Sequence, residues 1–359
     1  LEERGTVEFA GRFAKVTPLP LALRLASDWW KRKRSEDVAA FIEGTREAGL
    51  VEPFCRQMEK LHHLSRSRKI VDELCGTTGP FGQAEILDTE WGSRLLRSFA
   101  SINPEAVARA MQRAFGGMSI EDLRQVEAGR RNLVWTLERL AFWEDTFPIA
   151  ARLLLRFGAA ENESWSNNAT GQFRQLFHVS LPGTEAPLNP RLQVLREGIQ
   201  SKESSERRLA ILGLSSALQT QHFSRTGGVE EQGGRIPKQD YRPSNKEALD
   251  YWQECTEVLA DLACEDIMVN LVKKEFGEQI GGLITSGAYK EVIQAAKRFI
   301  SCTNQLWPEA LSSTQWAINH GLQEAPPGVR SDVSNFYESL LPDDVLGRVA
   351  LWVTNSGRF

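Results

Sequence analysis

The chain has 359 residues, of which 41% are hydrophobic and 25% are charged, and its formal net charge at pH 7 is −4. These values are typical of a globular protein, and they exclude collagen, a disordered chain and a coiled-coil rod. The slightly acidic balance argues against a protein that binds polyanions through its net charge. A chain of this length predicts about two domains or one long repeat array.

The predicted elements are almost all helical. Residues 5–16 carry the best strand pattern and predict a short hairpin, after which apolar residues recur with the spacing of amphipathic helices. Several helix starts carry caps, such as Ser35 before two acidic residues and Asn103 before Pro104. The predicted helices cover residues 35–49, 50–64, 67–75, 89–101, 103–115, 119–128, 131–143, 147–160, 170–178, 188–200, 203–220, 245–265, 266–280, 287–302, 308–320, 330–340 and 343–354.

This pattern predicts an all-α fold, either a HEAT/TPR-like helical solenoid or an irregular helical array, with at most a short N-terminal hairpin. A shift of 42 residues aligns Leu95 with Leu137 and Phe115 with Phe157, and this period is typical of two-helix repeats. Glycines and prolines among polar residues at 224–244 indicate a flexible linker or long loop. It separates a helical repeat region, residues 31–223, from a C-terminal helical region, residues 245–359.

We expect one buried cluster between the predicted helices 131–143 and 147–160, because their apolar residues share a face. Its members are Trp135, Leu137, Leu140, Leu153, Leu154 and Phe157.

The five cysteines are odd in number and lack C-x-x-C spacing, so neither a disulfide framework nor a zinc ribbon is predicted. We expect buried thiols in a reducing, cytoplasmic compartment. The sequence contains no apolar run that predicts a membrane span and no signal-peptide core. Because it begins at Leu1 and not at Met, we expect a piece of a longer polypeptide.

The motifs that could carry chemistry are weak. The glycine-rich residues 76–82 lack the lysine of a nucleotide loop, which favours a structural turn. Glu59 and His62 have the spacing of half a di-metal motif, but a solvent-facing helix end explains them better. No G-x-S-x-G elbow is present, and a hidden cysteine–histidine pair is disfavoured. The sequence therefore predicts no enzyme, no cofactor and no metal site in this chain.

Two segments are candidate partner contacts. Residues 29–34 place two tryptophans beside four cations, which could bind phosphates and bases, although a helix C-terminus with inward-packed rings is the favoured interpretation. Residues 165–171 place paired asparagines in a loop, where they could cap a helix or hold a neighbouring chain's backbone. Trp307 and Trp316 also lie near helix ends, where exposure is expected. The candidate contacts are Trp29, Trp30, Lys31, Arg32, Lys33, Arg34, Trp165, Asn167 and Asn168.

Several segments resemble the helical region that follows the winged helix in bacterial STAND-type NTPases, which are related to NACHT and NB-ARC proteins. The segments are residues 1–5, 16–22, 79–85, 132–138 and 159–185. The resemblance covers roughly residues 1–200 and implies that residues 1–30 end a winged-helix-like element. It further implies a sensor region whose intact protein couples binding to an NTPase switch, often in defence against phage. None of the family's Walker or sensor residues has a counterpart in this sequence.

Three functions remain open at this point. A helical module that binds a protein or a neighbouring protomer fits the helical pattern and the resemblance best. The alternatives are a nucleic-acid-binding helical repeat that uses residues 31–34, and an enzyme with an unrecognised site.

Overall fold

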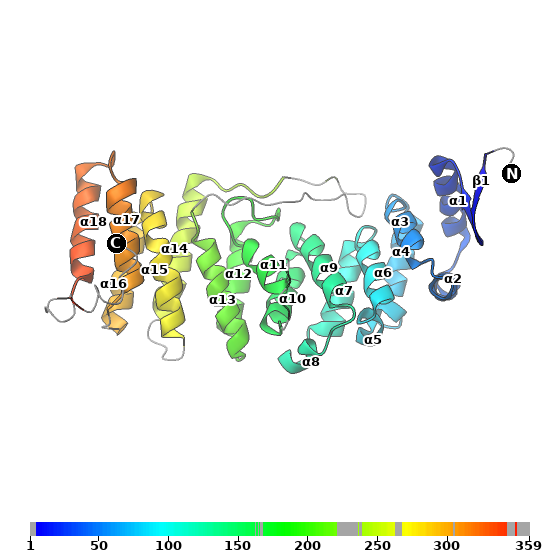
Figure 1. Cartoon of the computed structure of the whole chain (residues 1–359), viewed down its shortest axis with the longest axis horizontal. Helices are drawn as coiled ribbons and strands as arrows, with labels where there is room; N and C mark the ends of the chain where they lie inside the picture. Colours follow the sequence, from blue (N-terminus) through cyan, green and yellow to red (C-terminus); the bar gives the residue numbers. More distant parts are fainter. Residues whose placement is uncertain are drawn as a thin grey trace. The chain divides into compact units, whose positions relative to one another are not determined.

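A computed structural model describes residues 5–161, 163, 165, 168–220, 236, 239–262, 268–303, 306–342 and 349. Within these residues the chain is an all-α helical array with one two-stranded hairpin, which confirms the predicted fold class. The chain forms two compact units, and Figure 1 shows the helices of each unit following one another in chain order. Unit 1 comprises residues 1–163 and 228–239, and unit 2 comprises residues 164–227 and 240–359.

Unit 1 begins with the predicted hairpin, whose antiparallel strands pair Val7 with Val16 and Phe9 with Ala14. Gly11 lies in its turn with a φ of 59°, a backbone conformation that favours glycine. The elements of unit 1 are β1 (Val7–Ala10), β2 (Phe13–Val16), α1 (Leu19–Arg32), α2 (Ser35–Glu47), α3 (Val51–Glu59), α4 (Ser65–Leu74), η1 (Pro80–Gly82), α5 (Ala84–Leu87), α6 (Glu90–Ala100), α7 (Pro104–Phe115), α8 (Ile120–Arg124), α9 (Arg130–Phe142) and α10 (Phe147–Ala159).

Unit 2 continues the helical pattern and includes one short π-helical segment directly after α17. The elements are α11 (Ala169–Gln175), α12 (Leu188–Ile199), α13 (Ser204–Ala217), α14 (Asn245–Asp261), α15 (Val269–Thr285), α16 (Tyr289–Thr303), α17 (Pro308–Trp316), η3 (Ala317–Gly321) and α18 (Pro327–Leu340). The predicted helix at 343–354 lies outside the described residues, apart from position 349. Most of the predicted linker, residues 224–244, also lies outside them.

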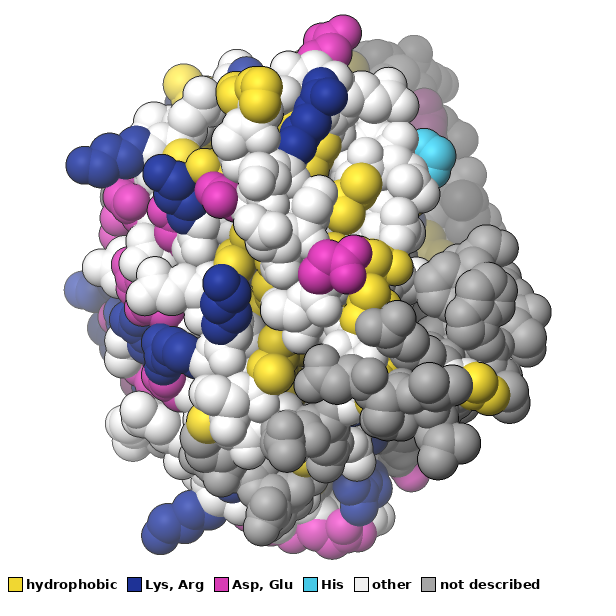
Figure 2. All heavy atoms as spheres, turned by 90° about the vertical axis from the view of Figure 1, so that its left-hand side faces the viewer, with side chains coloured by type: hydrophobic (Ala, Val, Ile, Leu, Met, Phe, Trp, Pro, Cys, Tyr) yellow, Lys and Arg dark blue, Asp and Glu magenta, His cyan; other side chains and the backbone are white. Residues whose placement is uncertain are grey.

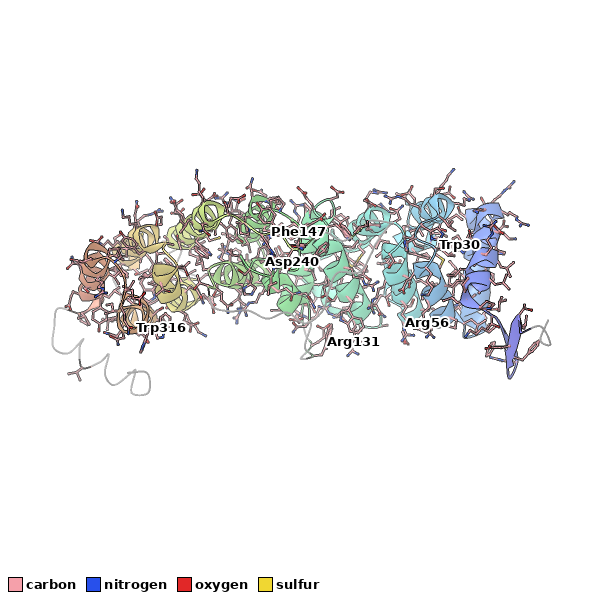
Figure 3. All side chains as sticks on the ribbon, turned by 90° about the horizontal axis from the view of Figure 1, so that it is seen from above. Trp30, Arg56, Arg131, Phe147, Asp240 and Trp316 are labelled. Carbon is pink, nitrogen blue, oxygen red and sulfur yellow. The ribbon has the colours of Figure 1, made fainter. Side chains whose placement is uncertain are left out.

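Each unit is built from two layers of helices. In unit 1, α3, α6 and α9 contact one another in succession, while α4, α7 and α10 form the second layer. In unit 2, α12, α14, α16 and α18 form one layer, and α13, α15 and α17 form the other. Figure 3 shows the helices of each unit from above. Alternate helices therefore belong to alternate layers, which is the arrangement of stacked two-helix repeats.

The predicted cap at Asn103 is confirmed, whereas the one at Ser35 is wrong, because Ser35 is the first residue of α2 and Arg34 is its N-cap. The Asn103 side chain accepts a hydrogen bond from the Ala106 backbone N–H at 3.2 Å, and Pro104 opens α7. Ser244 accepts from the Glu247 backbone N–H, and Glu247 accepts in return from the Ser244 backbone, which forms a capping box. These contacts satisfy backbone donors that the first turn of a helix leaves unpaired.

The 42-residue match corresponds to real structural equivalence between α6–α7 and α9–α10. Leu95 and Leu137 are both fully buried, and the rings of Phe115 and Phe157 meet edge to face with centroids 5.4 Å apart. Five of the six residues predicted for the cluster between α9 and α10 are fully buried. Trp135 is the exception. It is half-buried and lies beneath the Arg97 guanidinium, 4.8 Å from its ring centroid, so this member of the prediction is wrong.

Arginine side chains join successive repeats of unit 1 at helix C-termini. Arg113 donates to the carbonyl of Cys75, the C-cap residue of α4, and Arg156 donates to the carbonyl of Gly116, the C-cap residue of α7, at 2.6 Å. The last carbonyls of a helix lack partners within it and carry partial negative charge. Each arginine therefore caps the preceding repeat and fixes the stacking of two helices in one layer.

Candidate functional site

The two tryptophans of α1 differ in exposure. Trp30 is 1% exposed and its ring stacks on Phe54 of α3 with centroids 6.3 Å apart, so it is a core residue. Its assignment as a partner contact is therefore corrected. Trp29 is half-buried, and its ring contacts Phe41 of α2 with centroids 4.8 Å apart. The sequence favoured inward packing for both rings, and this holds fully only for Trp30.

An apolar stripe crosses α1 and α2 at the place where Trp29 reaches the surface. Leu25 precedes Trp29 by one helical turn and is 52% exposed, and Phe41 is 43% exposed. Residues four apart on a helix lie on the same face, so Leu25 and Trp29 are neighbours. Large apolar side chains that are exposed together are unusual on a protein surface and indicate an interaction site.

The four cations at residues 31–34 differ in the contacts that their side chains and backbone make. Lys31 forms an ion pair with Asp28 at 3.6 Å, and Lys33 lies over the Trp29 ring at 5.7 Å. The Arg34 backbone N–H donates to the carboxylate of Asp37 at 3.2 Å, while its side chain is exposed.

Arg32 is exposed and has no ion-pair partner in the part of the chain that the structure describes. The four cations therefore border the apolar stripe. Lys31 is paired with Asp28, whereas the side chains of Arg32 and Arg34 are exposed.

A second helix adds positive charge to the same place. Arg66, at the start of α4, donates through Nε and Nη2 to the carbonyl of Lys33, at 3.2 and 2.5 Å. Lys69 follows Arg66 by three residues on α4 and is exposed. The cations that the sequence singled out thus lie beside Arg66, which comes from another repeat. The sequence contains no sign of this contact, because residues 33 and 66 are brought together only by the stacking of α1 on α4.

The second predicted segment behaves as a cap. Asn168 is the N-cap of α11, and its side chain accepts from the Gly171 backbone N–H at 2.9 Å. Trp165 is half-buried, and Asn167 lies outside the described residues. For Asn168 the capping interpretation is therefore confirmed.

The glycine-rich residues 76–82 form a closed structural turn. A Cβ atom on Gly79 would lie 2.2 Å from the Leu74 carbonyl, and one on Gly82 would lie 2.4 Å from the Gly76 carbonyl. The glycines are required for this close backbone approach. Within the described ranges, moreover, no three His, Cys, Asp or Glu side chains gather as a metal site would need.

Three cysteines match the expectation, and one does not. Cys55, Cys75 and Cys255 are free and buried, and burial raises the pKa of Cys55 to about 11 and of Cys75 to about 12. These thiols are therefore protonated and unreactive near neutral pH. Cys302 is exposed and disulfide-bonded, so the expectation of buried, reduced cysteines is wrong at this position.

A buried arginine in unit 2 is the strongest polar feature that the sequence did not reveal. Arg191 of α12 is fully buried and donates to the carbonyls of Ala186 and His178, at 2.8 and 3.1 Å. Its guanidinium lies 5.7 Å from the ring centroid of Tyr241. Burial lowers the pKa of Arg191 to about 10, so it stays charged at neutral pH.

Arg191 ties together two segments without secondary structure. One is the loop before α12, and the other reaches it where the Tyr241 backbone N–H donates to the Thr184 carbonyl at 2.9 Å. A buried charge that bonds to backbone carbonyls fixes loop geometry, and this is the role that its contacts support. No sequence signal distinguishes Arg191 from the exposed arginines, because its partners are main-chain atoms.

Trp316 is the most exposed tryptophan of those predicted to lie near helix ends. It is 46% exposed at the end of α17, where Figure 3 labels it, and its ring lies 6.2 Å from that of His320 in the π-helical segment. Trp307, by contrast, is 2% exposed and packs on Phe299. Only one of these two tryptophans therefore has the exposure expected of it.

Comparisons with protein-family models, with curated proteins and with solved structures found no match to this chain. Across the described residues, no helix is both long enough and apolar enough to cross a membrane.

Proposed function

We propose that this chain is a helical scaffold that binds a protein partner and performs no chemistry of its own. The observation that carries this proposal is the apolar stripe of Leu25, Trp29 and Phe41 bordered by the cations of residues 31–34, which we call the α1 surface. Protein interfaces have an apolar, aromatic centre and a polar rim, and Trp and Arg contribute most of their binding energy. The α1 surface has this composition.

Nucleic acid is the alternative occupant of the α1 surface, because four cations stand beside an aromatic ring. Acidic side chains intervene, however. Asp28 pairs with Lys31, and Asp37 lies at the start of α2 beside Arg34. These carboxylates would repel a phosphate backbone, whereas a protein surface can pair with charges of both signs. The arrangement therefore favours a protein partner.

The resemblance to STAND-type NTPases leads us to propose a place for this binding in a larger bacterial protein. The helical array would act in the cytoplasm as the sensor, and an upstream nucleotide switch would respond to the bound partner, in defence against phage. Support comes from the resembling segments alone. The test is the full reading frame: a G-x-x-x-x-G-K-[ST] motif about 200–300 residues upstream of Leu1 is expected, in keeping with that nucleotide-loop signature.

The protein partner is tested by cross-linking capture from cells, with quantification of each captured protein. Leu25→Glu should abolish capture of the partner, because it places a charge in the apolar stripe. Leu19→Glu is the matched control, since Leu19 lies on the same helix, has the same 52% exposure and lies outside the stripe. Capture that Leu19→Glu abolishes equally, or that nuclease treatment removes, would contradict a protein partner at this surface.

The absence of chemistry is tested on the same purified chain. We expect no stoichiometric binding of ATP and no ATP hydrolysis above the rate measured in buffer alone. Binding of one ATP per chain would overturn this part of the proposal.

A further inference from the structure

An open groove of about 660 Å³ lies between α16 and α18 in unit 2. The cations Lys290, Lys297 and Arg298 line it from α16, and Asp332 lines it from α18. Figure 2 looks onto this end of the chain and shows Lys and Arg side chains beside a band of apolar side chains. The groove belongs to neither the α1 surface nor the buried contacts of Arg191.

Two of the three cations are available to a ligand. Lys290 and Lys297 are exposed, and within the described residues neither of them forms an ion pair. Arg298 is held by an ion pair with Asp261 of α14. The α16 wall of the groove therefore offers two unpaired ammonium groups, spaced about 10.5 Å along the axis at the rise of an α-helix.

Amide side chains lie on both walls between these charges. Gln294 of α16 is exposed between the two lysines, and Asn335 of α18 is exposed one turn from Asp332. A side-chain amide has both donors and an acceptor, as a peptide group has, so it can pair with a peptide main chain. Asp332 can accept a hydrogen bond from a main-chain N–H, a donor that a phosphate backbone does not have.

We infer that this groove binds an extended acidic segment of a protein, with its carboxylates on Lys290 and Lys297 and its main chain on Gln294 and Asn335. Carboxylates three residues apart in a polyproline II conformation are separated by about 9.3 Å and lie on one side, which is close to the spacing of the two lysines. The lysine side chains are long enough to close the remaining difference.

The inference is tested by fluorescence anisotropy on the full chain. The probe is a labelled peptide with the core Glu-Pro-Pro-Glu, and its controls are the Gln-Pro-Pro-Gln peptide and a single-stranded DNA of matched length. We expect the acidic peptide to bind, the Gln peptide to bind at least about tenfold more weakly, and affinity to fall as salt screens the charges. Tighter binding of the DNA than of the peptide would overturn the inference.

The double variant Lys290→Glu/Lys297→Glu should weaken binding of the acidic peptide at least about tenfold, because two attractive contacts become repulsive. The matched control is Lys246→Glu/Lys274→Glu, which changes the net charge equally at exposed lysines of α14 and α15 in the same unit. It should leave the affinity within about twofold. Circular dichroism checks that both variants remain folded.

Equal loss in the two double variants would mean that net charge alone attracts the peptide, and it would overturn a site in the groove. If the groove variant loses affinity in folded form while the charge control does not, the α16 wall is the binding site. Asn335→Leu then tests the main-chain contact, and unchanged affinity of this variant would remove that part of the inference.

Discussion

Phe115 and Phe157, forty-two residues apart, pack edge to face at the ends of α7 and α10, with an angle of 74° between their ring planes. Both are fully buried and occupy the same position in successive repeats. The two rings therefore occupy equivalent positions in neighbouring repeats, and they contact each other. This contact joins adjacent repeats of the second layer of unit 1.

This contact predicts an energetic coupling. In a double-mutant cycle with Phe115→Leu and Phe157→Leu, we expect the two losses of unfolding free energy to be non-additive by about 0.5–1.5 kcal/mol, the usual value for an aromatic pair. Urea unfolding of the four proteins measures it. A second cycle between Phe157→Leu and Phe54→Leu, whose residue lies on α3, should be additive.

Truncation of a side chain in the core between α9 and α10 should lower the free energy of unfolding strongly. Leu154 is fully buried, so Leu154→Ala should lower the free energy of unfolding by about 2–5 kcal/mol, through lost burial and the cavity left behind. Leu25→Ala removes the same atoms from a side chain that is 52% exposed, and it should cost far less. Similar losses for the two variants would show that the assigned helix face is wrong.

Removal of the buried Arg130 side chain should lower the stability of the fold. Arg130 is 2% exposed, donates to the carbonyls of Leu123 and Phe157 at 2.7 and 2.8 Å, and forms an ion pair with Glu163. Arg130→Met should lower stability by about 3–5 kcal/mol, because it leaves these acceptors without their donor. Arg131→Met, one position along, changes an exposed residue and should cost less than about 1 kcal/mol in the same denaturation experiment.

His178 predicts a pH dependence of stability. Burial, assisted by the nearby charge of Arg174, lowers its pKa from 6.5 to about 4. Between these values the unfolded chain binds the proton more readily, so stability is full above pH 6.5 and falls as the pH drops towards 4. At pH 5 we expect His178 to contribute a loss of about 2 kcal/mol relative to pH 7. In His178→Gln this part of the pH dependence should be absent, and an unchanged profile would show that other groups cause it.

The sequence predicted the fold well because the all-α class depends on local signals. Periodic apolar residues and caps such as Asn103 mark the helices without knowledge of the rest of the chain. Trp135 was misplaced because its exposure depends on Arg97, a residue of the neighbouring repeat. Helical spacing placed Trp135 near the core face, but it could not show that a guanidinium covers the ring.

The candidate sites were predictable only in part. Residues 29–34 stood out because their charges and rings are consecutive, yet the burial of Trp30 depends on Phe54 of another helix. The groove between α16 and α18 left no signal, because Lys290 and Lys297 are ordinary surface lysines until Asn335 faces them. A surface assembled from separate helices is determined by their stacking, which a single sequence does not reveal.

The arginine caps of unit 1 have a consequence for how such a chain can evolve. In the part of unit 1 that the structure describes, side-chain bonds between helix pairs join residues 33 to 42 apart, so each pair is tied to its neighbours in the sequence. Insertion of a duplicated pair would interrupt one interface and loss of a pair would remove two, and the pair that becomes the new neighbour could supply an arginine for the exposed helix end. Such an array can gain or lose whole helix pairs while the interfaces between the other pairs are preserved.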